Sequence, residues 1–97
     1  MYDIELTPEA REDLKSFRKF ERKEIVNEIE LRLTYEPAVE TRNRKEMRPN
    51  EVACWELRVR RFRVFYNVYD EQSLVTVEAI GFKIGNVLFI RGQRTEL

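Results

Sequence analysis

Apolar and polar residues alternate at the start of the chain and then change to a helical spacing. Tyr2, Ile4 and Leu6 alternate with acidic residues, and this period of two predicts a half-buried strand. Thr7 and Pro8 then indicate a helix start, because threonine caps helices and proline suits the first helical position. The apolar residues that follow recur at the spacing of one helix face.

This first helix is predicted to run to about Arg18, and a second helix from about Arg22 to Tyr35. Pro37 lies just beyond the second helix. The apolar stripe of that helix consists of Ile25, Val26, Ile29 and Leu33. Since the link between the two helices is short and polar, the pattern predicts an antiparallel helical hairpin.

Residues 38–52 show no sustained periodicity and are predicted to form a loop, which is long for a chain of 97 residues. Long loops are more often functional or mobile than short ones. The loop carries four basic residues: Arg42, Arg44, Lys45 and Arg48. A solvated connection and a binding loop both fit this pattern.

The rest of the chain alternates in a way that predicts three antiparallel strands. The first begins at Trp55, which shares one face with Leu57 and Val59. The second and third strands are predicted over residues 62–69 and 74–80, where β-branched and aromatic residues are frequent. A short tail follows.

The order of elements predicts an α+β fold in a single domain over residues 1–97: an N-terminal strand, a helical hairpin and a three-stranded antiparallel meander. Both helices are expected to pack on one face of the sheet. Trp55, Phe62 and Tyr66 would face the helices and are therefore predicted to lie in the core.

Charge is balanced overall but not along the chain. Lysine and arginine number 18, as do aspartate and glutamate, which gives a net charge of zero. Residues 1–41 hold seven basic and eleven acidic residues, a balance of −4, and residues 42–97 hold eleven and seven, a balance of +4. The second half therefore offers a local basic excess to a phosphate backbone.

The start of the chain lacks a basic region followed by an apolar run, and no apolar stretch is long enough to span a bilayer. A single cysteine, Cys54, cannot form an internal disulfide, which fits a reducing compartment. We therefore expect a cytoplasmic protein with no membrane association.

Several kinds of catalytic and binding site are excluded by composition. The chain has no histidine, so it has no Ser-His-Asp triad and no histidine-based metal site. One cysteine excludes a zinc ribbon. Glycines occur only at positions 81, 85 and 92, which is too few for a phosphate-binding loop. No metal and no small-molecule cofactor are expected.

The segment WELRVRRFRVFY, residues 55–66, carries four arginines in six positions. If the turn falls at Arg60 and Arg61, Arg58 and Arg63 point to the same sheet face, and Lys83 follows the third strand. Like charges on neighbouring strands destabilise a sheet, so a bound phosphate would explain them. Alternatively, Glu56 and Glu78 neutralise them as ordinary surface pairs.

The segment from Trp55 to Gly92 resembles the sheet core of the RelE/ParE toxin superfamily of bacterial toxin–antitoxin operons. The shared features are an alternating aromatic strand, an arginine strand ending in tyrosine, an acidic turn, and an Ile-Gly-x-Lys sequence. The Thr-Pro-Glu-Ala helix start and the TRNRKEMRPN loop are also similar, so the resemblance covers nearly the whole chain.

The resemblance implies a RelE-like, ribosome-dependent mRNA endoribonuclease in which the RNA 2′-OH attacks the adjacent phosphate. Arg63 matches the arginine that stabilises the phosphorane charge, Arg58 a strand lysine, and Lys83 a basic residue with an acid or phosphate-binding role. Glu56 stands where RelE has another lysine and could act as a base, and Phe89 stands near a RelE tyrosine.

RNA and the ribosome would then contact a basic surface on the loop, the hairpin turn and the tail. The predicted binding residues are Arg42, Arg44, Lys45, Arg48, Arg60, Arg61, Phe89 and Arg91. Phe65, Tyr69 and Phe89 are the candidates for stacking on RNA bases. The expected partners are the ribosome, mRNA and a cognate antitoxin. The alternatives are a ParE-like DNA gyrase inhibitor and a catalytically silent antitoxin-binding module.

Overall fold

The N-terminal strand, the two helices and the antiparallel meander form as the sequence predicts. The computed structural model describes residues 1–97. The elements are β1 (Asp3–Leu6), α1 (Pro8–Lys15), α2 (Lys19–Leu33), β2 (Arg44–Glu46), β3 (Trp55–Val59), β4 (Phe62–Tyr69), a 3-10 turn (Asp70–Gln72), β5 (Leu74–Ile84), β6 (Val87–Ile90) and β7 (Gln93–Thr95).

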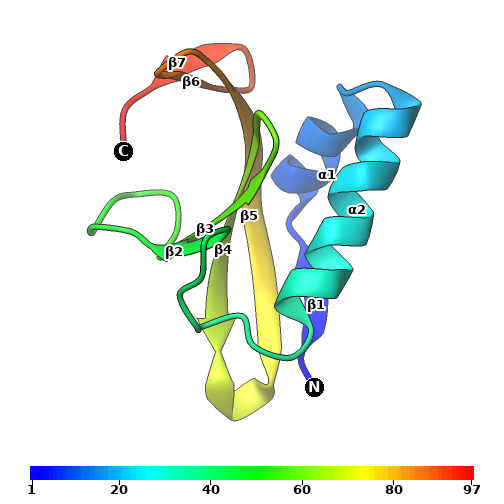
Figure 1. Ribbon diagram of the computed structural model, residues 1–97, viewed down its shortest axis with the longest axis vertical. Coiled ribbons are helices and arrows are strands. Elements are labelled where there is room, and N and C mark those ends of the chain that lie inside the picture. Colours follow the sequence, from blue (N-terminus) through cyan, green and yellow to red (C-terminus); the bar gives the residue numbers. More distant parts are fainter.

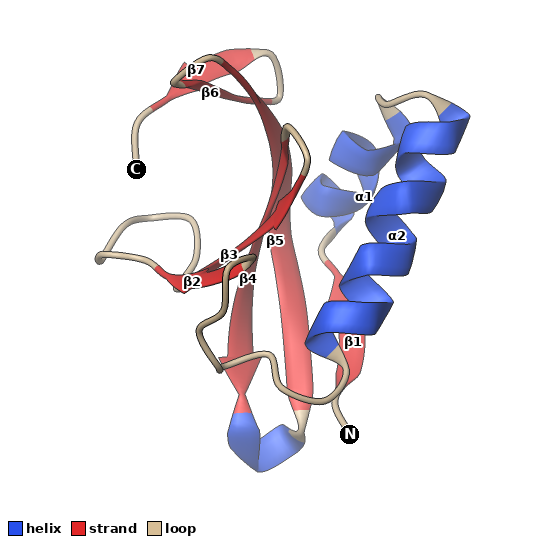
Figure 2. Cartoon of the chain, in the orientation of Figure 1, coloured by secondary structure: helices blue, strands red, loops and turns tan.

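All seven strands belong to one curved sheet, with both helices on its outer side (Figures 1 and 2). The strands follow the order β2-β3-β4-β5-β6-β7, and each neighbouring pair is antiparallel. β1 instead pairs in parallel with the start of β5, from Asp3 opposite Leu74 to Leu6 opposite Val77. Because β4 occupies one edge of β5, β1 and β6 share its other edge.

Three strand segments extend beyond the prediction. β2 lies inside the expected loop, β5 continues past residue 80 to Ile84, and the tail forms the β6–β7 hairpin. β2 consists of charged residues only, so it carries no apolar alternation. It pairs with β3 through Lys45 opposite Glu56, which places opposite charges across the strands. Figure 1 shows β6 and β7 curling toward the concave side of the sheet.

Side-chain caps fix the helix starts. The Thr7 hydroxyl accepts a hydrogen bond from the Ala10 amide at 3.1 Å, as the sequence predicts. α2 begins at Lys19, three residues earlier than predicted, because the Glu21 carboxylate accepts the Arg18 backbone N–H at 3.0 Å. This hydrogen bond lowers the pKa of Glu21. Neither helix is long and apolar enough to cross a membrane.

The main core lies between the sheet and the helices. Trp55, Phe62 and Tyr66 are buried there, as predicted. The Tyr66 hydroxyl donates to the Pro37 carbonyl at 2.7 Å, and burial raises the pKa of Tyr66. The other members are Ala10, Ile25, Ile29, Leu33, Leu57, Val59, Val64, Val75, Val77 and Ile80.

A second, smaller core fills part of the opposite, concave side of the sheet. It consists of Ala53, Phe65, Ala79, Leu88 and Ile90, and Met47, Val52 and Leu97 pack against it. The prediction that Phe65 could stack on RNA is wrong, because its side chain is fully buried in this cluster. Residues of the loop and of the C-terminus cover Phe65, and strand alternation alone does not predict this cover.

A buried carboxylate fastens α1 to β5. Asp13 accepts the Ile80 backbone N–H at 3.0 Å, and its other oxygen lies 3.1 Å from Arg91 Nε. The register of β4 and β5 shifts here, since Phe65 faces Ala79 but the next residue of β4 faces Val77. Asp13 therefore satisfies a backbone donor beside an irregular part of the ladder. Its burial raises the pKa of the Asp13 carboxyl.

Asp13→Ala should lower the free energy of unfolding by about 2 kcal/mol, because it leaves the buried Ile80 N–H without an acceptor. Asp13→Asn keeps an acceptor oxygen and should cost less. Because the folded state raises the pKa of Asp13, the parent should lose stability as pH rises through that value. Urea titrations at several pH values between acidic and neutral would show this fall in the free energy of unfolding in the parent but not in Asp13→Asn.

Candidate functional site

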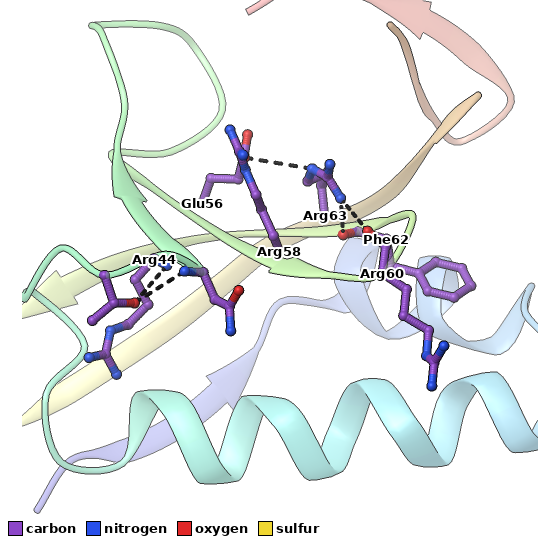
Figure 3. Close-up of polar contacts among 8 residues, drawn as sticks. Arg44, Glu56, Arg58, Arg60, Phe62 and Arg63 are labelled. Atoms are coloured by element: carbon purple, nitrogen blue, oxygen red, sulfur yellow. Dashed lines mark hydrogen bonds and ion pairs between the residues drawn. The ribbon is translucent and has the colours of Figure 1, made fainter. Parts of the chain in front are cut away.

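The β3–β4 hairpin brings two arginines together on the concave side of the sheet. Its turn falls at Arg60 and Arg61, as the sequence predicts, with Arg60 at a φ of 54°. Arg58 therefore lies directly opposite Arg63 in the ladder. Figure 3 shows both side chains, with Glu56 beside them, on the side of the hairpin that faces away from α2.

Glu56 is the acidic partner of this pair. Its side chain is 12% exposed, and its Oε1 accepts from Arg58 Nε at 3.0 Å and lies 3.7 Å from Arg63 Nε. Glu78, the other acid expected to neutralise the cluster, forms no ion pair and instead accepts a hydrogen bond from Thr76 at 2.6 Å. Local neutralisation therefore comes from one glutamate.

Arg63 is the most enclosed cation of the group, with a side chain that is 13% exposed. Its Nη1 donates to the backbone carbonyls of Arg60 and Phe62, both at 2.8 Å. Its buried Nε has no hydrogen-bond partner. Burial lowers the pKa of the Arg63 guanidinium, Glu56 opposes this effect, and Arg58 adds to it. The two backbone carbonyls thus fix the Arg63 guanidinium on the concave side, next to Arg58 and Glu56.

Two lysines share the concave side with this pair. Gly81 lies opposite Arg63 in the β4–β5 ladder, and Lys83, two residues further along β5, points to the same face. Lys45 lies opposite Glu56 and also shares this face. Neither lysine forms an ion pair. We define Arg58, Arg63, Lys45, Lys83 and Glu56 as the concave cluster, which holds four cations and one anion.

Lys45 is predicted from the sequence only as an RNA- or ribosome-binding residue of the loop. Its place in the cluster could not be predicted, because β2 has no apolar alternation that would indicate its pairing. Arg44, its neighbour, has a structural role. The Arg44 guanidinium donates to the Arg32 carbonyl at 2.6 Å and to the Val39 carbonyl at 2.9 Å, which ties the loop to the end of α2. Arg42 and Arg48 are exposed and form no ion pair.

The arginines of the hairpin turn point to the helix side, away from the concave cluster. Arg60 Nε lies 2.7 Å from Glu24, which raises the pKa of Arg60, and Arg61 Nη2 lies 3.1 Å from Glu21. The Arg61 guanidinium also lies 4.8 Å from the centre of the Phe62 ring. Figure 3 shows Arg60 pointing toward α2.

Two residues of the tail also lie on the helix side. Phe89 stacks on Phe82 with ring centres 5.5 Å apart, and Phe82 packs against the main core. Arg91 pairs with Asp13 on α1 at 3.1 Å. The structure therefore does not bring Phe89 or Arg91 to Arg63. No group of three or more Cys, Asp or Glu side chains gathers where it could hold a metal ion.

The chain matches the family model described as the ParE toxin of the type II toxin–antitoxin system over residues 4–82. It belongs to this family, within the RelE/ParE superfamily. No curated protein matches the toxin in sequence.

Solved structures that share the fold of the toxin include two toxin–antitoxin complexes. One is the toxin–antitoxin complex RelBE2 from Mycobacterium tuberculosis, with 24% identity, 84% of this chain and 98% of that chain covered, and a TM-score of 0.69. The other is the intact E. coli RelBE toxin–antitoxin complex, with 17% identity, 87% and 99% covered, and a TM-score of 0.68. These matches confirm the predicted α+β architecture.

Proposed function

We propose that this toxin is a RelE-like, ribosome-dependent mRNA endoribonuclease whose active site is the concave cluster. The observation that supports this proposal is the way in which the Arg63 guanidinium is held. Its guanidinium is enclosed, is anchored to two backbone carbonyls and lies opposite Arg58 in the ladder, with Glu56 as its one acidic neighbour at 3.7 Å. A preorganised cation of this kind stabilises charge that develops in a transition state.

The proposed reaction is a transesterification within the RNA. The 2′-oxygen attacks the adjacent phosphorus and the bond to the 5′-oxygen breaks, which leaves a 2′,3′-cyclic phosphate and a 5′-hydroxyl. Glu56, held by Arg58, accepts the 2′-hydroxyl proton, and the Lys83 ammonium donates a proton to the departing 5′-oxygen. Arg63 and Arg58 stabilise the charge on the phosphorane oxygens.

The proposed chemistry uses no metal, so cleavage should survive chelation. The test uses ribosomes stripped of loosely bound metal and then kept intact with polyamines and a constant, low magnesium concentration. Adding a chelator selective for transition metals should leave the cleavage rate unchanged. Magnesium-dependent cutting of naked RNA by the purified toxin would contradict the mechanism.

The family match supports a second candidate, a ParE-like inhibitor of DNA gyrase. The two functions damage different macromolecules, so induction of the toxin in cells separates them. Rapid loss of protein synthesis together with new mRNA 5′ ends supports the endoribonuclease. Induction of the DNA-damage response while translation continues supports gyrase inhibition.

The proposed partner that silences the toxin is a cognate antitoxin. Both structural neighbours are complexes of a toxin with an antitoxin. The four cations of the concave cluster would attract an acidic segment that folds on binding. Co-expression with the product of a neighbouring small gene should abolish growth arrest. If the toxin is harmless when expressed alone at high level, the proposed function is wrong.

A further inference from the structure

Helix α2 carries a second stripe of residues, apolar at both ends, on the side that faces solvent. Its buried residues, Ile25, Ile29 and Leu33, pack on the sheet, whereas Phe20 and Leu31 are 68% and 66% exposed. Single exposed apolar residues are ordinary on protein surfaces. These two, however, share a line along the helix, opposite the buried face, and both line one shallow hollow.

The residues along this line are Phe20, Glu24, Asn27 and Leu31, spaced by four, three and four residues. This is the spacing of the contact positions in a coiled coil. In an antiparallel pair of such helices, Phe20 of each copy meets Leu31 of the other. The same alignment places Glu24 beside Asn27, so the two polar positions also meet. The stripe is therefore complementary to itself.

Charges on both flanks fit the same alignment. Lys23 and Glu30 are exposed, form no ion pair and lie on one flank of the stripe, where each would face its opposite charge on the second copy. Within the stripe, Glu24 is paired with Arg60 at 2.7 Å, and on the other flank Glu28 is paired with Arg32 at 3.1 Å. These two glutamates therefore bring little uncompensated negative charge into the contact.

We propose that two copies of this chain associate through antiparallel packing of α2 against α2. A second copy is the occupant because the stripe matches itself in apolar contacts and in charge. A single pair of short helices buries less than about 1,200 Å², which corresponds to a weak, concentration-dependent dimer. Because α2 lies on the far side of the sheet, the concave cluster stays open in the dimer (Figure 2).

Sedimentation equilibrium of the purified chain over about 1 µM to 1 mM tests the association. The average mass should rise toward that of a dimer in the parent. Phe20→Glu should remove the rise by placing an acid against Leu31. Ile84→Glu is the matched control, since Ile84 is 62% exposed at the end of β5, and it should associate like the parent.

The charge pair gives a second test that does not depend on the apolar substitution. Lys23→Glu should weaken association about tenfold, and the double variant Lys23→Glu, Glu30→Lys should restore it, because the swap recreates the pair across the symmetry axis. A single-chain mass at every concentration would overturn the proposal. A dimer that persists in Phe20→Glu would also overturn it, as would a charge swap that fails to restore association. If the parent chain forms no dimer but Phe20→Glu loses antitoxin binding, the stripe binds the antitoxin and the proposal is wrong.

Discussion

Arg63→Ala is expected to lower the proposed ribosome-dependent mRNA cleavage about 100-fold or more, which is the usual loss on removing one preorganised donor. The neighbouring cations have other tasks in the proposed mechanism, because Arg58 also holds Glu56 at 3.0 Å and Lys83 supplies the proton for the departing oxygen. Arg63→Lys should recover only part of the activity, because an ammonium keeps the charge but loses the planar fork.

The stability of this variant needs its own measurement. From the sequence, an arginine on an open sheet face should contribute little to folding. The structure changes this expectation, because the Arg63 side chain is 13% exposed and donates two hydrogen bonds. We now expect a loss of about 1–2 kcal/mol. Cleavage should therefore be assayed well below the unfolding temperature of Arg63→Ala.

The matched control is Arg42→Ala, which removes an exposed arginine outside the concave cluster. Primer extension on a translated message gives the cleavage rate, and growth arrest gives the cellular effect. Arg42→Ala should change the rate little and in a salt-dependent way. Equal toxicity of Arg63→Ala and the parent would mean that the cluster is a solvated face, and gyrase inhibition would then become the leading function.

Gly81→Ala is expected to have the largest effect on stability, a loss of about 3 kcal/mol or failure to fold. A Cβ atom at Gly81 would lie 2.4 Å from the Phe89 carbonyl oxygen and 2.9 Å from Ile90 Cγ1. The first of these neighbours is backbone, so the β6 strand itself would have to move. Thermal unfolding followed by circular dichroism measures the loss.

Gly85→Ala is the control for this prediction. Nothing lies within 4 Å of a Cβ at Gly85, so the substitution adds only the strain of a side chain at a φ of 61°. It should cost about 1 kcal/mol. If both variants unfold at the same temperature, close approach of β6 to Gly81 does not limit the fold.

The alternation of apolar and polar residues predicted the part of the concave cluster that lies on β3 and β4. Once the hairpin turn is placed at Arg60 and Arg61, the pairing of Arg58 with Arg63 follows from the period of two. The same rule could not predict that the Phe65 side chain is buried. Alternation places Phe65 on the concave side, but the solvent exposure of that side depends on residues 47–53 and Leu97, which come from elsewhere in the chain.

The sequence also could not predict which way the side chains of Arg60 and Arg61 point. Arg60 and Arg61 turn toward α2 because Glu24 and Glu21 lie there, and this contact depends on how the helix packs on the sheet. The resemblance to RelE predicts Phe89 as a binding residue, because it stands near a RelE tyrosine. Its side of the sheet is set by pairing with Phe82 in a hairpin whose strands are too short to show a period.

The parallel pairing of β1 with β5 affects when the toxin can fold during synthesis. Ribosomes release the N-terminus first, yet Asp3 and Leu6 pair with Leu74 and Val77. The helices also lack the sheet that buries their apolar faces until β3, β4 and β5 have emerged. The nascent chain therefore remains without its sheet through most of translation. The concave cluster, which needs β3, β4 and β5 together, can thus assemble only near the end of synthesis.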